Sequence, residues 1–223
     1  MSRVIKAEEG ETYDIELSKD LLKENERIAA ENKALLNSHG IKTVDVMGSI
    51  GTGKTFLIGQ LVQMLKGKYR IAAIAGDLTT TIDADSIARH GVEVVQINTG
   101  KECHLDANLV RKALKRIDLN GIDLLIIENV GNLICPAEFP LGSDKRVVVI
   151  SVTEGPNIVV KHPFVFMEAD VVVINKMDLA DAIGADVGKL EREVNEINPR
   201  VSVVRTSCKS GAGIADVIEA LGL

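Results

Sequence analysis

From residue 41 to the end of the chain, short runs of β-branched and aliphatic residues alternate with stretches whose apolar positions have helical spacing. Such runs predict strands buried on both faces, and the alternation is typical of an α/β fold with a mostly parallel sheet covered by helices on both faces. The expected strands are 41–47, 70–75, 92–97, 124–128, 146–152, 171–175 and 201–206. The expected helices between them are 55–66, 85–90, 106–117, 187–198 and 214–221.

The first forty residues follow a different pattern. Residues 1–17 alternate weakly and predict a tail or an edge strand. Ser18 is a suitable N-cap, and aliphatic residues then repeat every seven positions up to Gly40, which predicts one helix. The repeating residues are Leu21, Ile28 and Leu35, together with Leu22, Ala29 and Leu36. We expect residues 1–40 to form a tail and a helix packed on a single domain of residues 41–223, although the same stripe could form a dimer contact.

A glycine-rich segment separates the first expected strand from the helix that follows it. Its G-x-x-x-x-G-K-[ST] pattern is typical of the phosphate-binding loop of P-loop NTPases, in which backbone N–H groups surround an anion at a helix N-terminus. Lys54 would reach the β- and γ-phosphates, and the Thr55 hydroxyl would hold Mg²⁺. The alternative is a glycine-rich turn that binds nothing. The residues expected to contact the nucleotide here are Gly48, Ser49, Gly51, Thr52, Gly53, Lys54 and Thr55.

An N-K-x-D sequence follows the sixth expected strand. The Asp178 carboxylate can accept both the N1–H and the N2–H of guanine, and adenine has no N1 proton, so this residue favours GTP over ATP. Lys176 would lie along the purine face, and Asn175 would connect this segment to the phosphate loop. The remaining residues of the expected guanine site, after the last strand, are Ser207, Cys208 and Lys209. We interpret Cys208 as a small buried residue.

Two acidic residues come directly after apolar strands and are candidates for holding Mg²⁺. These are Asp77 and Glu128, and because Mg²⁺ takes only one or two carboxylates, one of them could act through water. Asp77 could instead be a turn residue. Residues 128–131 resemble the D-x-x-G switch of GTPases, with Gly131 offering its N–H to the γ-phosphate. The residues expected to act in catalysis are Lys54, Asp77, Glu128 and Gly131.

Asn132 follows this switch where Ras-like enzymes carry a glutamine that orients water. We therefore expect slow intrinsic hydrolysis, on the order of 10⁻⁴ to 10⁻² s⁻¹ or below.

Cys103, His104 and Cys135 form a second group of candidate ligands. Thiolates and an imidazole suit Zn²⁺ or Ni²⁺ better than Mg²⁺. Two buried thiols and a helix-capping histidine are the alternative, and the two interpretations are equally weighted on spacing alone. Adjacent residues such as Cys103 and His104 seldom close on one ion, so we expect a four-ligand site shared between two subunits.

Composition excludes several classes of function. The 223-residue chain carries a net charge of −6 and only 3% aromatic residues, which argues against a nucleic-acid partner. No segment has the length and apolar character of a membrane span or a signal peptide, so we expect a cytoplasmic protein. An odd number of cysteines, three, makes a disulfide framework improbable in a reducing compartment.

Taken in order, the motifs G-S-I-G-T-G-K-T, G-D, G-K-E-C-H-L-D-A, E-N-V-G-N-L-I-C-P, V-T-E-G and N-K-M-D-L resemble those of the HypB family of hydrogenase nickel-incorporation GTPases. The resemblance implies a dimerising fold like that of the signal-recognition-particle GTPases, and GTP hydrolysis coupled to nickel delivery to [NiFe]-hydrogenase. It implies GTP or GDP, Mg²⁺, and Ni²⁺ or Zn²⁺ at Cys103, His104 and Cys135. It also implies a homodimer promoted by GTP and metal, with a HypA-like nickel chaperone and the hydrogenase large subunit as partners.

The chain departs from the family pattern in three places. Ile50 replaces a common proline, residues 156–161 are less acidic than expected, and the N-terminal C-x-x-C-G-C motif and histidine-rich stretch of some members are missing.

Other functions remain open at this point. A urease-accessory GTPase would carry Cys-Pro-His, whereas in this chain Cys135 and Pro136 are followed by Ala137. A GTP-gated nickel or zinc module would show little turnover. The N-K-x-D sequence disfavours an ATP-using kinase.

Overall fold

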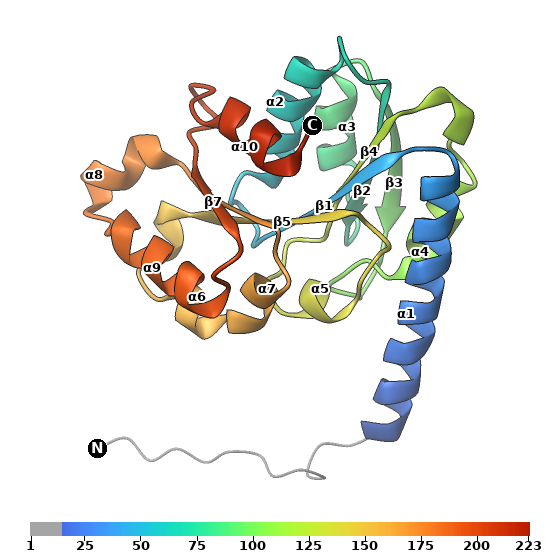
Figure 1. The fold of residues 1–223 in the computed structure, drawn as a ribbon, viewed down its shortest axis with the longest axis horizontal. Helices are drawn as coiled ribbons and strands as arrows, with labels where there is room; N and C mark the ends of the chain where they lie inside the picture. Colours follow the sequence, from blue (N-terminus) through green and yellow to red (C-terminus); the bar gives the residue numbers. More distant parts are fainter. Residues whose placement is uncertain (1–14) are drawn as a thin grey trace.

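Seven parallel strands form one sheet in the order β3-β2-β4-β1-β5-β6-β7 (Figure 1). The computed structural model describes the backbone of residues 15–223 and the side chains from residue 19 onward, so the tail predicted for residues 1–14 lies outside it. The strands are β1 (Lys42–Met47), β2 (Ile71–Asp77), β3 (Glu93–Asn98), β4 (Leu124–Glu128), β5 (Lys145–Ser151), β6 (Val171–Asn175) and β7 (Ser202–Arg205). All seven predicted strands are present, with bounds that differ by no more than two residues.

The first face of the sheet is covered by three helices that follow strands directly or close the chain. Alternate strand residues point to opposite faces, and Val44 and Val46 of β1 point to this one, where they share a buried cluster with Leu57 and Ile214. The helices are α2 (Lys54–Leu65), α3 (Ile82–Ala88) and α10 (Ile214–Leu221).

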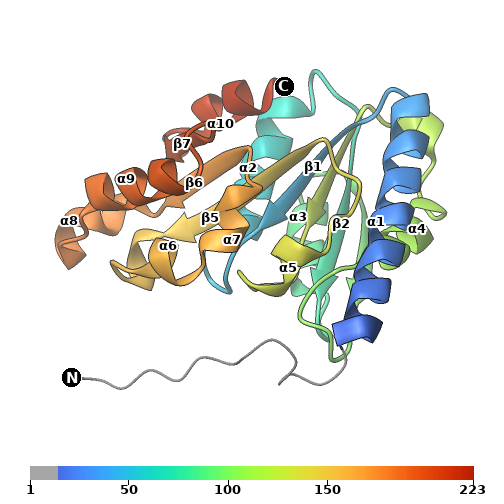
Figure 2. The same ribbon diagram turned by 60° about the horizontal axis from the view of Figure 1, so that its bottom comes forward.

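The opposite face carries two apolar clusters, one on each half of the sheet. Phe166 and Val194 pack over β5 and β6, while Val110 and Leu36 pack over β2 and β4. Figure 2 shows α1 lying beside α4 at one end of this layer. The larger helices of the layer are α1 (Ile15–Ser38), α4 (Ala107–Leu114) and α9 (Val187–Ile197).

Several short helices were not predicted, because four or five residues cannot display a helical period. They are α5 (Cys135–Glu138), α6 (Ile158–Lys161), α7 (Pro163–Met167) and α8 (Ala180–Ile183), with single 3₁₀ turns at η1 (Leu119–Gly121), η2 (Val152–Glu154) and η3 (Met177–Leu179). The helix predicted at 85–90 begins three residues earlier, since Thr81 precedes its first turn and Asp83 and Asp85 lie within that turn.

The N-terminal helix differs from its prediction in two ways. It already includes Ile15, so Ser18 lies inside it and is not its N-cap, and residues 15–17 are helical rather than an edge strand. Its predicted leucine stripe is also only partly correct, because Leu21 and Leu35 are exposed. The buried seam consists of Asn25, Ile28, Ala29, Asn32 and Leu36.

The ends of the parallel strands place the candidate residues together at the edge of the sheet where such folds bind ligands. Asp77 ends β2, Glu128 ends β4 and Asn175 ends β6, while the phosphate loop follows β1. Among residues 15–223, no helix combines the length and the apolar composition that crossing a bilayer requires.

Candidate functional site

The phosphate loop turns between β1 and α2 with a backbone that only glycine can adopt in places. Gly53 has φ = 100°, and a side chain there would strike the amide of Asn175. A side chain at Gly48 would strike the carbonyl oxygen of Val149 on the neighbouring strand. The tight approach of these segments explains the glycines, and it leaves the N-terminus of α2 pointing into a cleft.

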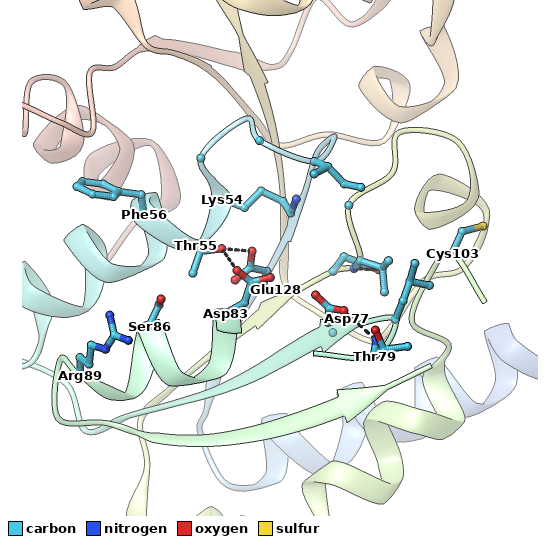
Figure 3. A pocket seen from close by; sticks show the side chains of 18 of the residues that line it. Lys54, Thr55, Phe56, Asp77, Thr79, Asp83, Ser86, Arg89, Cys103 and Glu128 are labelled. Atoms are coloured by element: carbon cyan, nitrogen blue, oxygen red, sulfur yellow. Dashed lines mark hydrogen bonds between the residues drawn. The ribbon is translucent and has the colours of Figure 1, made fainter. Parts of the chain in front are cut away.

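Lys54 is the first residue of α2 and is buried. Its Nζ donates hydrogen bonds to the carbonyl oxygens of Gly48 (3.0 Å) and Ser49 (3.1 Å), so the ammonium group lies inside the loop (Figure 3). Burial lowers the pKa of Lys54, while the nearby carboxylates of Glu128 and Asp83 oppose that shift. An ammonium group held in this way is suited to an anionic ligand.

The Thr55 hydroxyl lies between two carboxylates, 2.7 Å from Glu128 Oε1 and 2.8 Å from Asp83 Oδ1 (Figure 3). Glu128 is only 2% exposed, and its second oxygen, Oε2, has no hydrogen-bond partner within the described part of the chain. Burial raises the pKa of Glu128 to about 7. The Thr55 hydroxyl and the carboxylates of Asp83 and Glu128 offer the hard oxygen ligands that Mg²⁺ prefers. Because Glu128 Oε2 is left unsatisfied among the described residues, this group fits the ion.

Asp83 is a site residue that the sequence analysis missed. It lies in the first turn of α3, six residues beyond Asp77, and only the path of the loop brings it to Thr55. Its place in a first helical turn also suits a residue that merely stabilises the helix N-terminus.

Asp77 lines the same cleft but is engaged in a local turn. Its Oδ1 accepts hydrogen bonds from the backbone N–H groups of Thr79 (2.9 Å) and Thr80 (3.1 Å), and Oδ2 accepts one from the Thr80 hydroxyl (3.0 Å). Burial acts to raise the pKa of Asp77, but these hydrogen bonds outweigh it and lower the pKa. Asp77 therefore stays ionised beside the phosphate loop while it holds the turn.

The expected guanine segments meet around the side chain of Asn175. Asn175 Nδ2 donates to the Thr52 carbonyl oxygen (2.8 Å), and its Oδ1 accepts from the Thr206 hydroxyl (3.0 Å) and the Cys208 N–H (3.2 Å). The predicted connection from Asn175 to the phosphate loop is therefore present, and Cys208 is buried as expected.

The Asp178 carboxylate is exposed and accepts a hydrogen bond from the Ser207 hydroxyl at 2.7 Å. That hydrogen bond lowers the pKa of Asp178, so the carboxylate remains an acceptor at neutral pH. Lys176 lies two residues before Asp178, and its backbone is left-handed (φ = 63°), which turns the chain after β6. Lys209 follows Cys208 on the neighbouring loop.

Cys103, His104 and Cys135 come together within one chain. Their ligand atoms all lie within 4.8 Å of one another, and the two sulfur atoms are 2.8 Å apart. Adjacent residues seldom close on one ion, yet the ligand atoms of Cys103 and His104 do converge here. The loop after β3 turns between them, and Cys135 reaches the pair as the first residue of α5.

The chemistry of this thiol–imidazole cluster (Cys103, His104 and Cys135) fits a soft transition metal. The His104 ring stacks on Phe139 with centroids 3.9 Å apart, and its buried Nδ1 has no partner among the described residues. Burial lowers the pKa of His104, which favours the neutral imidazole that binds metals. Burial and the neighbouring Cys103 thiol raise the pKa of Cys135. Soft donors with an orphaned imidazole nitrogen suit Ni²⁺ or Zn²⁺.

Residues 128–132, the switch segment, run from the Thr55–Glu128–Asp83 group to the thiol–imidazole cluster. Gly131 packs closely against Ile50 of the phosphate loop, so a side chain at this position would have to displace the Ile50 side chain. Asn132 Nδ2 donates to the Cys103 carbonyl oxygen at 3.4 Å, so its side chain is turned toward the cluster.

One cleft of ≈ 790 Å³ extends from the phosphate loop past Glu128 to Cys103 (Figure 3). The nucleotide and metal candidates thus share one solvent space, whereas Asp178 does not line it. The lining residues that carry chemistry are Lys54, Thr55, Asp77, Asp83, Cys103 and Glu128.

Comparisons with known proteins show which family the chain resembles. Residues 42–205 match the family described as CobW/HypB/UreG, nucleotide-binding domain. The chain is 54% identical over 205 residues to the probable hydrogenase maturation factor HypB of Methanocaldococcus jannaschii. This match covers 92% of this chain and 93% of that protein.

Two solved structures are similar over nearly the whole chain. One is hydrogenase maturation factor HypB from Archaeoglobus fulgidus, with 44% identity, a TM-score of 0.83, and coverage of 90% of this chain and 98% of that one. The other is HypB from Helicobacter pylori in complex with nickel, with 34% identity, a TM-score of 0.84, and coverage of 89% and 93%.

Proposed function

This chain belongs to the HypB family of hydrogenase maturation factors, and on that premise we propose that it is a metal-binding GTPase that couples GTP binding and hydrolysis to nickel insertion into [NiFe]-hydrogenase. The observation that carries the proposal is the single cleft lined by both Lys54 and Cys103. A ligand on the phosphate loop and a metal on the thiol–imidazole cluster would face the same space.

The phosphate loop supplies the triphosphate site of this proposal. Lys54 would exchange its two loop carbonyl partners for phosphate oxygens, and Gly131, pressed against the loop at Ile50, would direct its N–H toward the γ-phosphate. Thr55 and Glu128 would hold Mg²⁺, with Asp77 acting through water and Asp83 as an added candidate. When bound, Mg²⁺ would neutralise charge that develops on the transferred phosphoryl group.

Slow turnover follows from the contacts of the switch. Asn132, in the position of a water-orienting glutamine, directs its amide to Cys103 instead, and no other described side chain takes that role by motif. We therefore propose intrinsic rates on the order of 10⁻⁴ to 10⁻² s⁻¹ or below.

The Asp178 carboxylate, kept ionised by Ser207, gives the proposed selectivity for guanine. Asn175 holds that loop to Thr52 of the phosphate loop, so base and phosphate recognition are joined by one buried amide. Lys176, Cys208 and Lys209 complete the proposed base site.

Nickel is the proposed cargo of the thiol–imidazole cluster, with Zn²⁺ as the competing ion. One chain offers three soft ligands, and a second subunit could supply a fourth, so we retain the homodimer as part of the proposal. Binding requires loss of the thiol protons, and the raised pKa of Cys135 makes metal affinity fall as pH falls. A HypA-like chaperone would deliver the ion and the hydrogenase large subunit would receive it, both in the cytoplasm.

The proposal is tested by two anaerobic measurements on the same protein. Phosphate release under multiple turnover should require GTP and Mg²⁺, with ATP as the matched substrate control. Ni²⁺ titration should lose its cysteine-dependent site in Cys135→Ala but keep it in Cys208→Ala, because Cys208 lies in the guanine loop. Turnover without metal binding would contradict the coupled function, and metal binding without turnover would favour a GTP-gated nickel or zinc module.

A further inference from the structure

Helix α1 docks on the domain through two buried asparagines. Asn25 is 6% exposed and Asn32 is 1% exposed, within a seam otherwise made of Ile28, Ala29 and Leu36. Buried amides are costly unless they are hydrogen-bonded, so their partners indicate what the seam is built to hold.

Both asparagines bond to the same two segments of backbone. Asn25 Oδ1 accepts from the Ala107 N–H (2.7 Å), and Asn25 Nδ2 donates to the Pro140 carbonyl oxygen (2.9 Å). Asn32 Nδ2 donates to the carbonyl oxygens of Ala107 (2.8 Å) and Leu141 (3.2 Å). Each side chain therefore bridges the start of α4 and the segment after α5.

Those two segments adjoin the candidate metal ligands in sequence. Ala107 lies three residues after His104, and Pro140 and Leu141 follow Phe139, whose ring stacks on His104. We call residues 103–107 the first arm and residues 135–141 the second arm. Cys103 and His104 thus belong to the first arm, and Cys135 belongs to the second. The contact is close as well, because a side chain at Gly142 would strike the Ala29 carbonyl oxygen on α1.

We propose that Asn25 and Asn32 are positioning residues of the thiol–imidazole cluster, and that α1 sets metal affinity by fixing the separation of the two arms that carry its ligands. The inference rests on the proposed metal binding. Ligands held in place before the ion arrives bind it more tightly, and residues that orient ligands typically contribute about 10–100-fold to metal affinity.

Two variants test this in the full-length chain. Asn25→Asp keeps an oxygen acceptor for Ala107 N–H but loses the donor to Pro140, and Asn32→Leu loses both donors. The matched control is Asn198→Leu, because Asn198 Nδ2 also donates to backbone carbonyl oxygens, those of Phe166 (3.0 Å) and Ala169 (2.9 Å), on segments without metal ligands.

The readouts are Ni²⁺ affinity by competition with a coloured chelator, the thiolate-to-nickel absorption band, GDP affinity, and the thermal midpoint. We expect both α1 variants to lose about tenfold or more in Ni²⁺ affinity and to alter the absorption band, with GDP affinity unchanged. The control should lower the thermal midpoint without changing Ni²⁺ affinity.

Wild-type Ni²⁺ affinity in either folded α1 variant would overturn the inference, as would an equal loss in the control. The parallel Cys135→Ala protein separates this from failure of the proposed function. If Cys135→Ala binds Ni²⁺ like the wild type, the cluster is not the metal site and both proposals fail. If only Cys135→Ala loses binding, the positioning role alone fails.

Discussion

The side-chain oxygen of Asn129 accepts a hydrogen bond from the backbone N–H of Leu105 at 3.0 Å. Both residues are buried. Asn129 follows Glu128 in the switch, and Leu105 follows His104 in the thiol–imidazole cluster. The bond therefore connects the segment of the proposed Mg²⁺ ligand Glu128 to the segment of the proposed nickel ligand His104, and we expect it to couple the two.

Replacing Asn129 should uncouple the two sites. Asn129→Leu leaves the buried Leu105 N–H unpaired, which should lower the free energy of unfolding by about 1–3 kcal/mol. More specifically, any difference in Ni²⁺ affinity between the GDP and GTP-analogue states should shrink. Ni²⁺ titrations in both states measure this, and an undiminished difference would show that coupling takes another route.

Asp178→Asn should change the preferred base. The amide presents a donor to the donors of guanine, so GTP affinity should fall, while xanthosine triphosphate, with an oxygen at that position, should gain. Competition binding with both nucleotides is the measurement. Unchanged GTP affinity would remove Asp178 from the base site.

Asp83 and Asp77 should behave differently when truncated. Asp83→Ala removes an oxygen next to the Thr55 hydroxyl, so it should weaken Mg²⁺-dependent GDP binding and leave binding without Mg²⁺ unchanged. Asp77→Ala should abolish turnover and also loosen the turn at Thr79 and Thr80. Normal hydrolysis by the Asp77 variant would identify Asp77 as a turn residue only.

The buried Asp45 gives a pH dependence of stability. Burial raises its pKa to about 6, and its Oδ2 has no hydrogen-bond partner among residues 19–223, so the folded chain binds an extra proton between about pH 4 and 6. Stability should therefore fall as pH rises through that window. Asp45→Asn keeps the acceptor for Asn129 Nδ2 (3.4 Å) and should add roughly 2–3 kcal/mol at pH 8. Equal chemical denaturation of both proteins at pH 8 would contradict this assignment.

The centre of the sheet was predictable because its inner strands are buried on both faces and appear as largely apolar runs, as in residues 171–174. The phosphate loop and the N-K-x-D residues could also be predicted, since each motif is a continuous stretch of sequence. Asp83 was not, because only the tertiary path of the loop after β2 brings its carboxylate to Thr55.

The two asparagines in the seam of α1 were missed for a related reason, although its apolar members Ile28, Ala29 and Leu36 belonged to the predicted stripe. A search for apolar periodicity counts leucines and ignores asparagines, so it selected the exposed Leu21 and Leu35 over Asn25 and Asn32. Those amides can be buried because they form hydrogen bonds with backbone groups of Ala107 and Pro140. Such tertiary partners cannot be found from sequence spacing.

We propose that nucleotide state and metal binding are linked through the shared cleft and across two subunits. The direct test is an anaerobic Ni²⁺ titration with GDP and with a non-hydrolysable GTP analogue, followed by sedimentation, in wild type and Cys135→Ala. We expect Ni²⁺ affinity to differ between the nucleotides, Ni²⁺ to change analogue affinity by the same factor, and metal with analogue to promote a dimer that Cys135→Ala does not form. Equal Ni²⁺ affinity in both nucleotide states, or in strictly monomeric and dimeric protein, would contradict the account.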